Sequence, residues 1–165
     1  MKITHLTPYL QGDAGRVITD LAVGQRAMGH DVTVVASRTG VPGFANGREH
    51  LDRLDGSGIQ TFLADSLFVR DYASNLSVAR LLGDMVGHHD GPDVIHAHGI
   101  VASLIALIFA GRRRKPMGLL HTVHAWHAVK TAGQAAADVH VLNLMDRVAT
   151  SSAHSAAILR GLGVS

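Results

Sequence analysis

The chain of 165 residues is long enough for one packed domain, and its composition excludes a disordered protein, since 47% of the residues are hydrophobic and only 17% are charged. The formal net charge of +2 is too small to indicate a nucleic-acid-binding protein, so we expect no nucleic acid as a partner. Cysteine is absent, which excludes disulfides and thiolate metal sites and fits a cytoplasmic protein.

Six short segments rich in β-branched and apolar residues predict β-strands. The clearest is Asp31–Ala36, whose residues are nearly all apolar, as in a parallel strand buried on both faces. The other five are Lys2–Leu6, Ile59–Leu63, Val94–Ala97, Gly118–Thr122 and Arg147–Thr150. Helical patterns separate these segments. We therefore expect a single α/β domain, a Rossmann-like, doubly wound parallel sheet of about six strands with helices on both faces.

Apolar residues at helical spacing predict helices between the strands. The first helix follows the loop Tyr9–Gly15, ends at Gly29 and places on one side Val17, Ile18, Leu21, Ala22 and Met28. Ser74 or Asn75 can cap a later helix, whose apolar positions are Val78, Leu81, Leu82, Met85 and Val86. Further helices are expected over Ile100–Ala110, near Thr131–Leu144, and from a cap at Ser151 or Ser152 to 161–163. Ile100–Ala110 is the longest mainly apolar run, and it is shorter than the roughly 20 residues of a membrane span.

Other stretches lack a periodic pattern. Ser37–Gly58 is rich in Gly, Arg and Asp, and we expect a long loop there, a kind of segment that is usually functional or mobile in a compact domain. The basic run Arg112–Lys115 follows an expected helix, where positive charge interacts favourably with the helix dipole. The alternative is peripheral contact of this run with an anionic membrane surface. His88 and His89 are expected at a solvated helix end.

Histidines lie at the points where two of the expected strands end. Val94–Ala97 contains His96 and is followed by His98 and by Gly99, which opens the next helix. The run His121-Thr-Val-His-Ala-Trp-His127 begins within the next strand and continues past its end. Because ligands of open parallel sheets bind outside the carboxyl ends of the strands, these side chains are placed to meet a ligand.

These histidines raise the question of a metal site, because neutral imidazole is a common metal ligand. No Asp or Glu lies within either group, and successive strand residues point to opposite faces, which separates His121 from Thr122 and His124. We therefore expect no metal ion, and we expect hydrogen bonds from the histidines to a polar ligand instead. His5 is expected to be an ordinary core or surface residue.

The loop Gly12-Asp13-Ala14-Gly15 lies between the first strand and the first helix. Such a loop can present backbone N–H groups and a helix N-terminus to a phosphate. The dinucleotide-binding pattern G-x-G-x-x-G is missing, and a tight turn with Asp13 near the cap position explains the same residues. From the residues alone, both interpretations stay open.

Several motifs, taken in order, resemble the N-terminal half of family-4 (group 1) glycosyltransferases with the GT-B fold. They are Pro8…Gly12-Asp13, Leu21-Ala22, Gly29-His30-Asp31-Val32-Thr33-Val34, Asp93-Val-Ile-His-Ala-His-Gly99, His121-Thr-Val-His124 and Asp146-Arg-Val-Ala-Thr-Ser-Ser152. The resemblance covers nearly the whole chain. Within the family, His124-Ala-Trp-His-Ala-Val-Lys130 is most similar to the subgroup containing sucrose-phosphate synthases and the mycothiol-pathway transferase.

The resemblance implies transfer of a sugar from a nucleotide-diphosphate sugar to a hydroxyl of a small-molecule, glycan or lipid acceptor. It also implies retention of the anomeric configuration and no metal or other cofactor. His124 would be the residue of the catalytic pocket that lies against the transferred sugar. The residues on the donor side would be Gly12, Asp13, His98 and Gly99, and those on the acceptor side would be Lys130 and Arg38.

Two features depart from the family pattern. The family loop usually has paired glycines, and Asp13 occupies the second of these positions, where a carboxylate would lie close to phosphate. The family's second domain binds most of the nucleotide and carries an E-x7-E motif, and nothing in this sequence matches it. We therefore expect residues 1–165 to be the N-terminal, acceptor-side domain, with the C-terminal donor-binding domain absent, and to be inactive alone.

Two other functions are compatible with the expected fold. Ser37-Arg38 at the end of the second strand suits the 2′-phosphate of NADP and would indicate an oxidoreductase, but the third glycine of the dinucleotide pattern is missing. A non-catalytic Rossmann-like binding module would use the same cleft without turnover.

Overall fold

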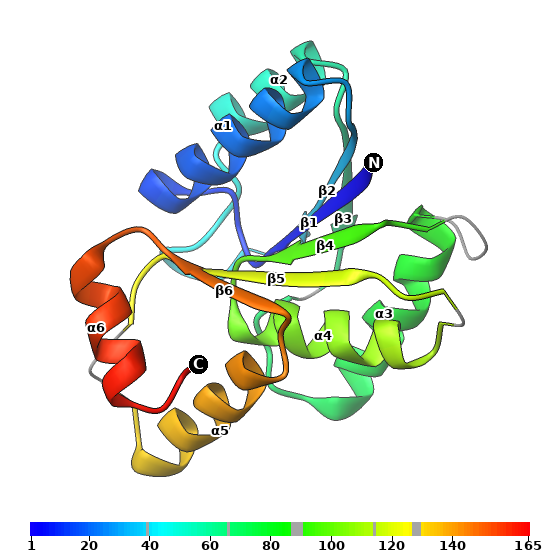
Figure 1. Ribbon diagram of the computed structural model, residues 1–165. Coiled ribbons are helices and arrows are strands. Elements are labelled where there is room, and N and C mark those ends of the chain that lie inside the picture. Colours follow the sequence, from blue (N-terminus) through cyan, green and yellow to red (C-terminus); the bar gives the residue numbers. More distant parts are fainter. Residues whose placement is uncertain (39, 66, 87–90, 114, 127–129) are drawn as a thin grey trace.

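The computed structural model describes residues 1–165 with the exception of 39, 66, 87–90, 114 and 127–129. Within the described residues, strands and helices alternate along the chain (Figure 1). The strands are β1 (Lys2–Thr7), β2 (Asp31–Ser37), β3 (Gln60–Ala64), β4 (Val94–Ala97), β5 (Gly118–Val123) and β6 (Arg147–Thr150). The helices are α1 (Gly12–Ala27), α2 (Arg48–Gly56), α3 (Tyr72–Val86), α4 (Ile100–Gly111), α5 (Ala132–Asn143) and α6 (Ala153–Gly161). The predicted α/β class is confirmed.

The strands form one parallel sheet in the order β3-β2-β1-β4-β5-β6. The chain extends the sheet from β1 through β2 to β3, and then crosses back to add β4, β5 and β6 on the other side of β1. The point of reversal therefore lies between β1 and β4, where His5 pairs in register with His96. In open α/β sheets, such a reversal creates a crevice for ligands at the carboxyl ends of the strands.

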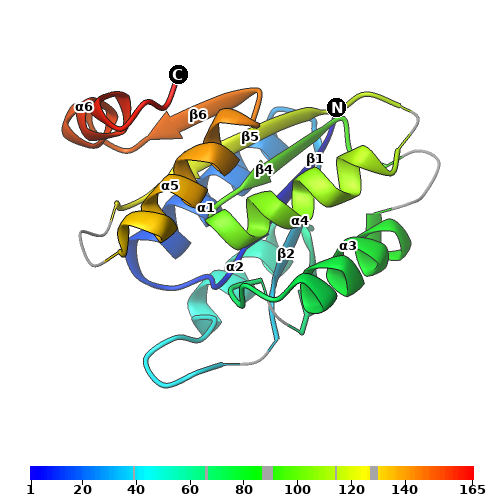
Figure 2. The ribbon, with the colours of Figure 1, turned by 90° about the horizontal axis from the view of Figure 1, so that it is seen from below.

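Helices cover both faces of this sheet, as predicted (Figures 1 and 2). Helices α1 and α2 pack on one face, which we call the α1 face, and α3, α4 and α5 pack on the other. The core on the α1 face consists of Leu10, Ile18, Ala22, Val32, Val34, Ala36, Leu54 and Ile59. The larger core on the opposite face is built from α3, α4 and the strand residues facing them, among them Leu6, Val35, Ile95 and Leu119. Helix α6 packs beside β6 at the sheet edge.

The buried side of α1 differs from the prediction. The helix begins at Gly12 rather than after Gly15, and its buried residues are Gly15, Ile18, Thr19 and Ala22. Val17, Leu21 and Met28, which the apolar pattern placed in the core, are 38%, 37% and 70% exposed. Small residues let the helix lie close to the strands, and Thr19 satisfies its hydroxyl by donating to the Gly15 carbonyl at 2.8 Å. The prediction is therefore right for Ile18 and Ala22 and wrong for Val17, Leu21 and Met28.

The expected long loop over Ser37–Gly58 is also wrong, because residues 48–56 form α2. Gly47 precedes the helix, and the buried residues His50 and Leu54 lie one turn apart. Leu51 completes a narrow apolar stripe against α1. Charged residues occupy most of the remaining positions, so the pattern of this short helix is too sparse to see in the sequence.

The start of α3 was predicted three to four residues too late, because Ser74 or Asn75 was expected to be the cap. Helix α3 begins at Tyr72, because the Asp71 carboxylate accepts a hydrogen bond from the Ser74 N–H at 2.7 Å. Leu81 is 39% exposed rather than buried. By contrast, the expected cap Ser152 does accept a hydrogen bond from the first turn of α6. Thr131, at the start of the expected helix 131–144, caps α5 in the same way.

No helix among the described residues is long and apolar enough to cross a bilayer. Within the basic run, Lys115 Nζ lies 3.1 Å from the Asp93 carboxylate, and the Arg113 guanidinium lies 5.4 Å from the centre of the Phe109 ring. These two residues thus contact the protein itself. Arg114 and the expected solvated histidines, His88 and His89, fall outside the described residues.

Candidate functional site

A cavity of about 600 Å³ lies at the carboxyl ends of β1, β4 and β5. Its walls come from the segment between β1 and α1, the start of α4, the segment 121–126, and residues that precede α3. Apolar and aromatic side chains form much of the lining, among them Tyr9, Phe44, Leu67, Phe68 and Trp126. The position agrees with the reversal of strand order, and the volume suits a small ligand.

The cavity brings together several of the residues that the sequence singled out. Gly12, His98, Gly99 and His124 line it, from three separate segments of the chain. The polar ends of β1, β4 and β5 therefore meet at one edge of the sheet, as predicted. Asp13, Arg38 and Lys130 are not among the lining residues.

Gly12 and Gly99 open two helices at the cavity wall. Gly12 has a φ of +56°, a left-handed conformation that favours glycine. A Cβ atom at Gly99 would lie 2.9 Å from Cγ of Pro8, so glycine permits the close approach of α4 to the segment after β1. The N-termini of α1 and α4, with their unpaired backbone N–H groups and partial positive charge, are therefore both at the cavity.

Asp13 lies in the first turn of α1 and is exposed. The N-cap of the helix is Gln11, whose side chain makes no capping hydrogen bond, so the expected cap position of Asp13 is wrong. A carboxylate in the first turn interacts favourably with the helix dipole. Asp13 thus offsets part of the positive potential that α1 presents at this end.

A series of hydrogen bonds joins α1 to the cavity through three histidines. His5 Nε2 lies 2.7 Å from Gln25 Oε1, and His5 Nδ1 lies 2.9 Å from His98 Nε2. His98 Nδ1 in turn lies 3.1 Å from His124 Nε2. His5 and His98 are buried, whereas His124 is half-buried at the cavity wall. His124 is therefore a cavity-lining residue that a buried partner holds in place.

The remaining histidines at these strand ends have other partners. His96 Nε2 lies 2.7 Å from Thr122 Oγ1, and its ring centre lies 4.1 Å from that of His98. His121 points towards α4, where its Nδ1 lies 2.6 Å from Ser103 Oγ. The alternation of strand residues thus separates His121 from Thr122 and His124, as predicted. His127 falls outside the described residues.

Burial keeps these imidazoles neutral. It lowers the pKa of His5 and of His121 from 6.5 to about 4, and the pKa of His96 to about 3. Burial, together with the neighbouring imidazoles, lowers the pKa of His98 well below its ordinary value. Burial also lowers the pKa of His124. At neutral pH, each ring therefore offers one N–H donor and one acceptor nitrogen.

His5, His96 and His98 form the group of described residues whose geometry comes closest to a metal site. One ring nitrogen from each lies within 4.8 Å of the others. Nitrogens bound to one tetrahedral zinc ion lie about 3.4 Å apart, given zinc–nitrogen distances of roughly 2.0–2.1 Å. The facing nitrogens of His5 and His98 are only 2.9 Å apart and share a hydrogen bond. The arrangement fits a hydrogen-bonded network better than a metal centre.

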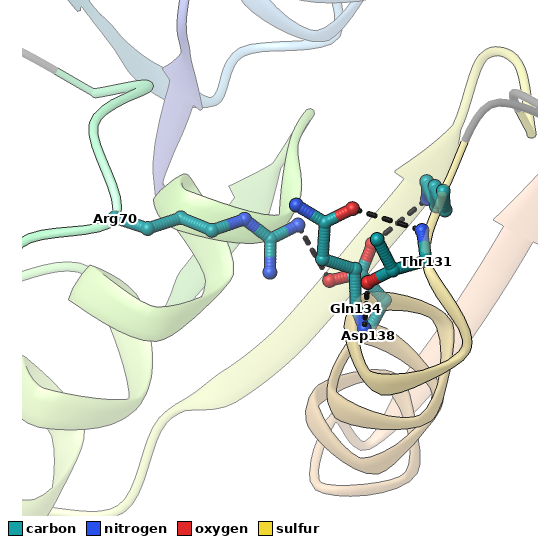
Figure 3. A network of polar contacts seen from close by, with 5 residues as sticks. Arg70, Thr131, Gln134 and Asp138 are labelled. Atoms are coloured by element: carbon teal, nitrogen blue, oxygen red, sulfur yellow. Dashed lines mark hydrogen bonds and ion pairs between the residues drawn. The ribbon is translucent and has the colours of Figure 1, made fainter.

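Asp138 holds two cationic side chains near the cavity (Figure 3). It is fully buried in α5, and its carboxylate accepts hydrogen bonds from Arg70 at 2.6 Å and from Lys130 at 2.8 Å. Arg70 lines the cavity. The Lys130 ammonium also lies 3.6 Å from the centre of the Trp126 ring, so Lys130 reaches the cavity wall through Trp126 and not directly.

Arg38, expected on the acceptor side, is exposed at the end of β2. Its Nη2 donates to the Leu63 carbonyl at 3.0 Å, and its Nε lies 3.7 Å from the Asp65 carboxylate. Both contacts hold Arg38 on the β3 side of the sheet, whereas the cavity lies at the ends of β1, β4 and β5.

Sequence reasoning did not identify Gln25, Arg70 or Asp138. Gln25 and Arg70 lie in segments without a motif, and their partners are distant in sequence. Asp138 carries one usable signal, since it stands at helical spacing from the buried residues Val141 and Leu142. A carboxylate on the buried side of a helix requires a partner, which points to a buried ion pair.

Comparisons with known proteins agree with this architecture. The family model described as Glycosyltransferase Family 4 matches residues 14–165. A sucrose-phosphate synthase from Thermosynechococcus elongatus has a similar structure, with a TM-score of 0.69 and 15% identity over 100% of this chain and 46% of that one. HepE from Anabaena, which was solved in complex with UDP, is also similar. Its TM-score is 0.69 and its sequence identity 18%, over 100% of this chain and 42% of that one.

MurG from Acinetobacter baumannii is also similar, with a TM-score of 0.60 and 13% identity over 92% of this chain and 42% of that one. The chain thus spans less than half the length of these three proteins. Sequence comparison with curated proteins gives no match. The structural likeness shows the fold, and the family model covers most of the sequence. The chain therefore belongs to glycosyltransferase family 4.

Proposed function

We propose that the protein transfers a sugar from a nucleotide-diphosphate sugar to an acceptor hydroxyl with retention of configuration, and that the cavity at the ends of β1, β4 and β5 forms one side of the site. The observation that carries this proposal is the meeting of Gly12, His98, Gly99 and His124 at one cavity in a chain of this family. The acceptor is a small molecule, a glycan or a lipid.

The ends of α1 and α4 suit the charge of the donor. Backbone N–H groups at a helix N-terminus bind phosphate well, and preorganised dipoles stabilise the charge that develops on a departing diphosphate. Gly12 and Gly99 place two such ends at the cavity. Arg70 adds a guanidinium to the lining. HepE, which shares this fold, was solved with UDP, and this supports a nucleotide ligand for the present protein.

His124 suits contact with the transferred sugar. Its ring is neutral, half-buried and held by His98, so it forms a fixed hydrogen-bonding group on the wall of the cavity. A fixed partner places the anomeric carbon relative to the acceptor, and small errors in such placement cost roughly 100-fold in rate. Arg38 and Lys130 remain proposed acceptor-side residues, with Lys130 acting through Trp126.

A second domain is part of this proposal. The three similar structures are more than twice as long as the part that this chain covers. A cavity open on one side cannot exclude water from a transferring sugar, so residues 1–165 alone are expected to show no turnover. Turnover of any nucleotide-sugar by the purified 165-residue chain would contradict this expectation.

The proposal also includes the metal requirement of the reaction and the location of the protein. We expect no metal requirement, because the facing nitrogens of His5 and His98 already share a hydrogen bond and the other nitrogen of each ring is bonded to Gln25 or His124, although His96 Nδ1 has no partner. A cytoplasmic location is proposed from the absence of cysteine. Contact of the basic run near Lys115 with a membrane surface is compatible with a lipid acceptor.

The test is an assay of the protein together with its nucleotide-binding domain. Radiolabelled UDP-, GDP- and ADP-sugars are offered with mixed acceptors in the presence of a chelator, and NADP(H) binding is titrated in parallel. We expect transfer of one sugar, with product NMR showing the anomeric configuration of the donor. Binding of NADP(H) without sugar transfer would indicate the oxidoreductase instead. If neither the nucleotide-sugars nor NADP(H) bind, the protein would be a non-catalytic module.

A further inference from the structure

His124 is the cavity end of the hydrogen-bonded series that starts at Gln25 on α1. The series crosses β1 and β4 in the buried interior, since His5 and His98 are 0% and 6% exposed. The His5 and His98 rings are nearly parallel, with an interplanar angle of 16° and centres 5.2 Å apart. Such packing leaves each ring in one orientation. The ends of the series, one on the helix and one at the cavity, are therefore connected through fixed side chains.

Each neutral imidazole carries a single N–H, so the proton positions along the series depend on one another. The Gln25 side chain is assigned with its amide oxygen towards His5, and because this oxygen only accepts, the assignment places the His5 proton on Nε2. His5 Nδ1 must then accept from His98 Nε2. His98 Nδ1 must accept from His124 Nε2 in the same way. All three rings are consequently Nε2–H tautomers.

We propose that Gln25, His5 and His98 are positioning residues that fix His124 as its Nε2–H tautomer and leave His124 Nδ1 as an acceptor for a donor group of the ligand. Among the described residues, the His124 ring is hydrogen-bonded through Nε2 to His98, which leaves Nδ1 available on the cavity wall. The identification of that donor as a sugar hydroxyl rests on the proposed function. The assignment of the tautomer does not, because it follows from the hydrogen bonds alone.

Burial of the rings favours an unbroken series of hydrogen bonds. A nitrogen of His5 or His98 that lost its partner would be a buried polar group without a hydrogen bond, which is costly. Low pKa values keep a second proton off the rings at neutral pH, so none of them becomes a double donor. The direction of the series is thus set at Gln25, the one member that is not a histidine.

Histidine tautomers are distinguished by long-range ¹H–¹⁵N NMR spectra of protein labelled with ¹⁵N-histidine. The unmodified chain is compared at neutral pH with Gln25→Met, which removes the acceptor, and with Gln25→Glu, which keeps an acceptor oxygen at the same length. The matched control is Gln60→Met, at an exposed position of β3. The exposed residue His154 serves as an internal reference.

We expect His124 to be a single Nε2–H tautomer in the unmodified chain, in Gln60→Met and in Gln25→Glu, and to become a mixture of both tautomers in Gln25→Met. His154 should be unchanged in all four proteins. A His124 signal that shows Nδ1–H in the unmodified chain, or that does not respond to Gln25→Met in a protein that is still folded, would overturn the proposal. If Gln25→Met does not fold, the proposal is tested by the unmodified chain and Gln25→Glu: an Nε2–H tautomer of His124 in both supports it, and an Nδ1–H tautomer in either contradicts it.

These outcomes are independent of the transferase assay. A tautomer that depends on Gln25, found together with no sugar transfer in the assay that includes the nucleotide-binding domain, would support the series and contradict the proposed function. Transfer activity with a mixed His124 tautomer would contradict the series alone.

Discussion

At the scale of single residues, the polar groups near the cavity depend on buried partners. Asp138 is the clearest example, since a fully buried carboxylate bridges Arg70 before α3 and Lys130 before α5. Burying a carboxylate is unfavourable without charged partners, so this site requires both cations. The bridge joins two segments that are distant in the chain and both close to the cavity (Figure 3).

Replacing Asp138 by Asn should destabilise the protein by about 2–4 kcal/mol, because the cations lose their counter-charge within the fold. The lower part of that range applies if Arg70, which is 42% exposed, turns to solvent. Urea unfolding measures the change. The control is Asp52→Asn, which removes an exposed pair with Arg48 and should change the unfolding free energy by less than about 0.5 kcal/mol. Equal effects of the two substitutions would contradict a structural role for Asp138.

The buried histidines predict a pH dependence of stability. The pKa values of His5 and His121 in the folded protein are about 4 and that of His96 is about 3, all below 6.5. Above about pH 6.5 neither state binds these protons. Between pH 6.5 and 4 the unfolded state binds more of them, so acidification lowers stability by about 1.4 kcal/mol per pH unit for each histidine that stays neutral when folded.

The groups that face this cluster do not cancel the effect. Neighbouring imidazoles lower the pKa of His96 further. The Asp138 carboxylate raises the pKa of His121, but burial lowers it by more, so the net shift is downward. Urea unfolding at pH 7.5, 6.5 and 5.5 measures the dependence. Stability that stays constant from pH 7.5 to 5.5 would show that the cluster is charged or solvated in the folded protein.

At the scale of secondary-structure elements, the approach of α4 to the segment after β1 shapes the cavity. Gly99 lies against the ring of Pro8, and the two segments bring the start of α4 to the same wall as Gly12. A side chain at Gly99 would push these segments apart, which couples helix packing to the shape of the site.

Gly99→Ala should destabilise the protein by about 1–3 kcal/mol through this overpacking. The matched control is Gly24→Ala inside α1, where an added Cβ meets no atom within 4 Å. That substitution should stabilise the protein by about 0.5–1 kcal/mol, because glycine is a poor helix former. Thermal unfolding of both variants tests whether Gly99→Ala lowers the stability and Gly24→Ala raises it. A Gly99→Ala protein as stable as the parent would contradict the tight contact with Pro8.

The elements also show what the sequence can predict. The strand bounds agree to within one residue, because runs such as Asp31–Ala36 bury both faces and contain few polar residues. The buried side of α1 was predicted only in part, because the contact with the sheet also uses Gly15 and Thr19, which an apolar pattern does not select. Helix α2 was missed, because its stripe of His50, Leu51 and Leu54 is short.

The site was predicted in part for a related reason. Once the strands are predicted, the positions of their carboxyl ends are known as well, so His98, Gly99 and His124 could be placed at one edge of the sheet. Their partners could not be predicted, because His5 and His98 are 93 positions apart and meet only through the order of β1 and β4. Asp13 and Arg38 were assigned by position in a motif, and their side chains lie away from the cavity lining.

At the scale of the whole molecule, the sheet order determines where the site lies. Strand β4 lies beside β1, and α1 and α4 lie on opposite faces of the sheet (Figure 1). The ends of α1, α4 and β5 meet around one cavity, and the histidine series connects that cavity to α1. In the proposed enzyme, this cavity faces a second domain that binds most of the nucleotide. His124 is then the residue of the present chain on which the rate of transfer depends most.

The most direct measurement is kcat/KM of His124→Ala in the protein with its nucleotide-binding domain, together with its melting temperature. The matched control is His154→Ala, at an exposed position of α6. We expect kcat/KM of His124→Ala to fall by about 30-fold or more, which corresponds to about 2 kcal/mol of lost transition-state stabilisation, with an unaffected control. The melting temperature should fall, because His98 Nδ1 loses its partner, but the variant should remain folded at the assay temperature. A His124→Ala enzyme with the kcat/KM of the parent, or one whose loss of activity follows from unfolding, would contradict the role of His124.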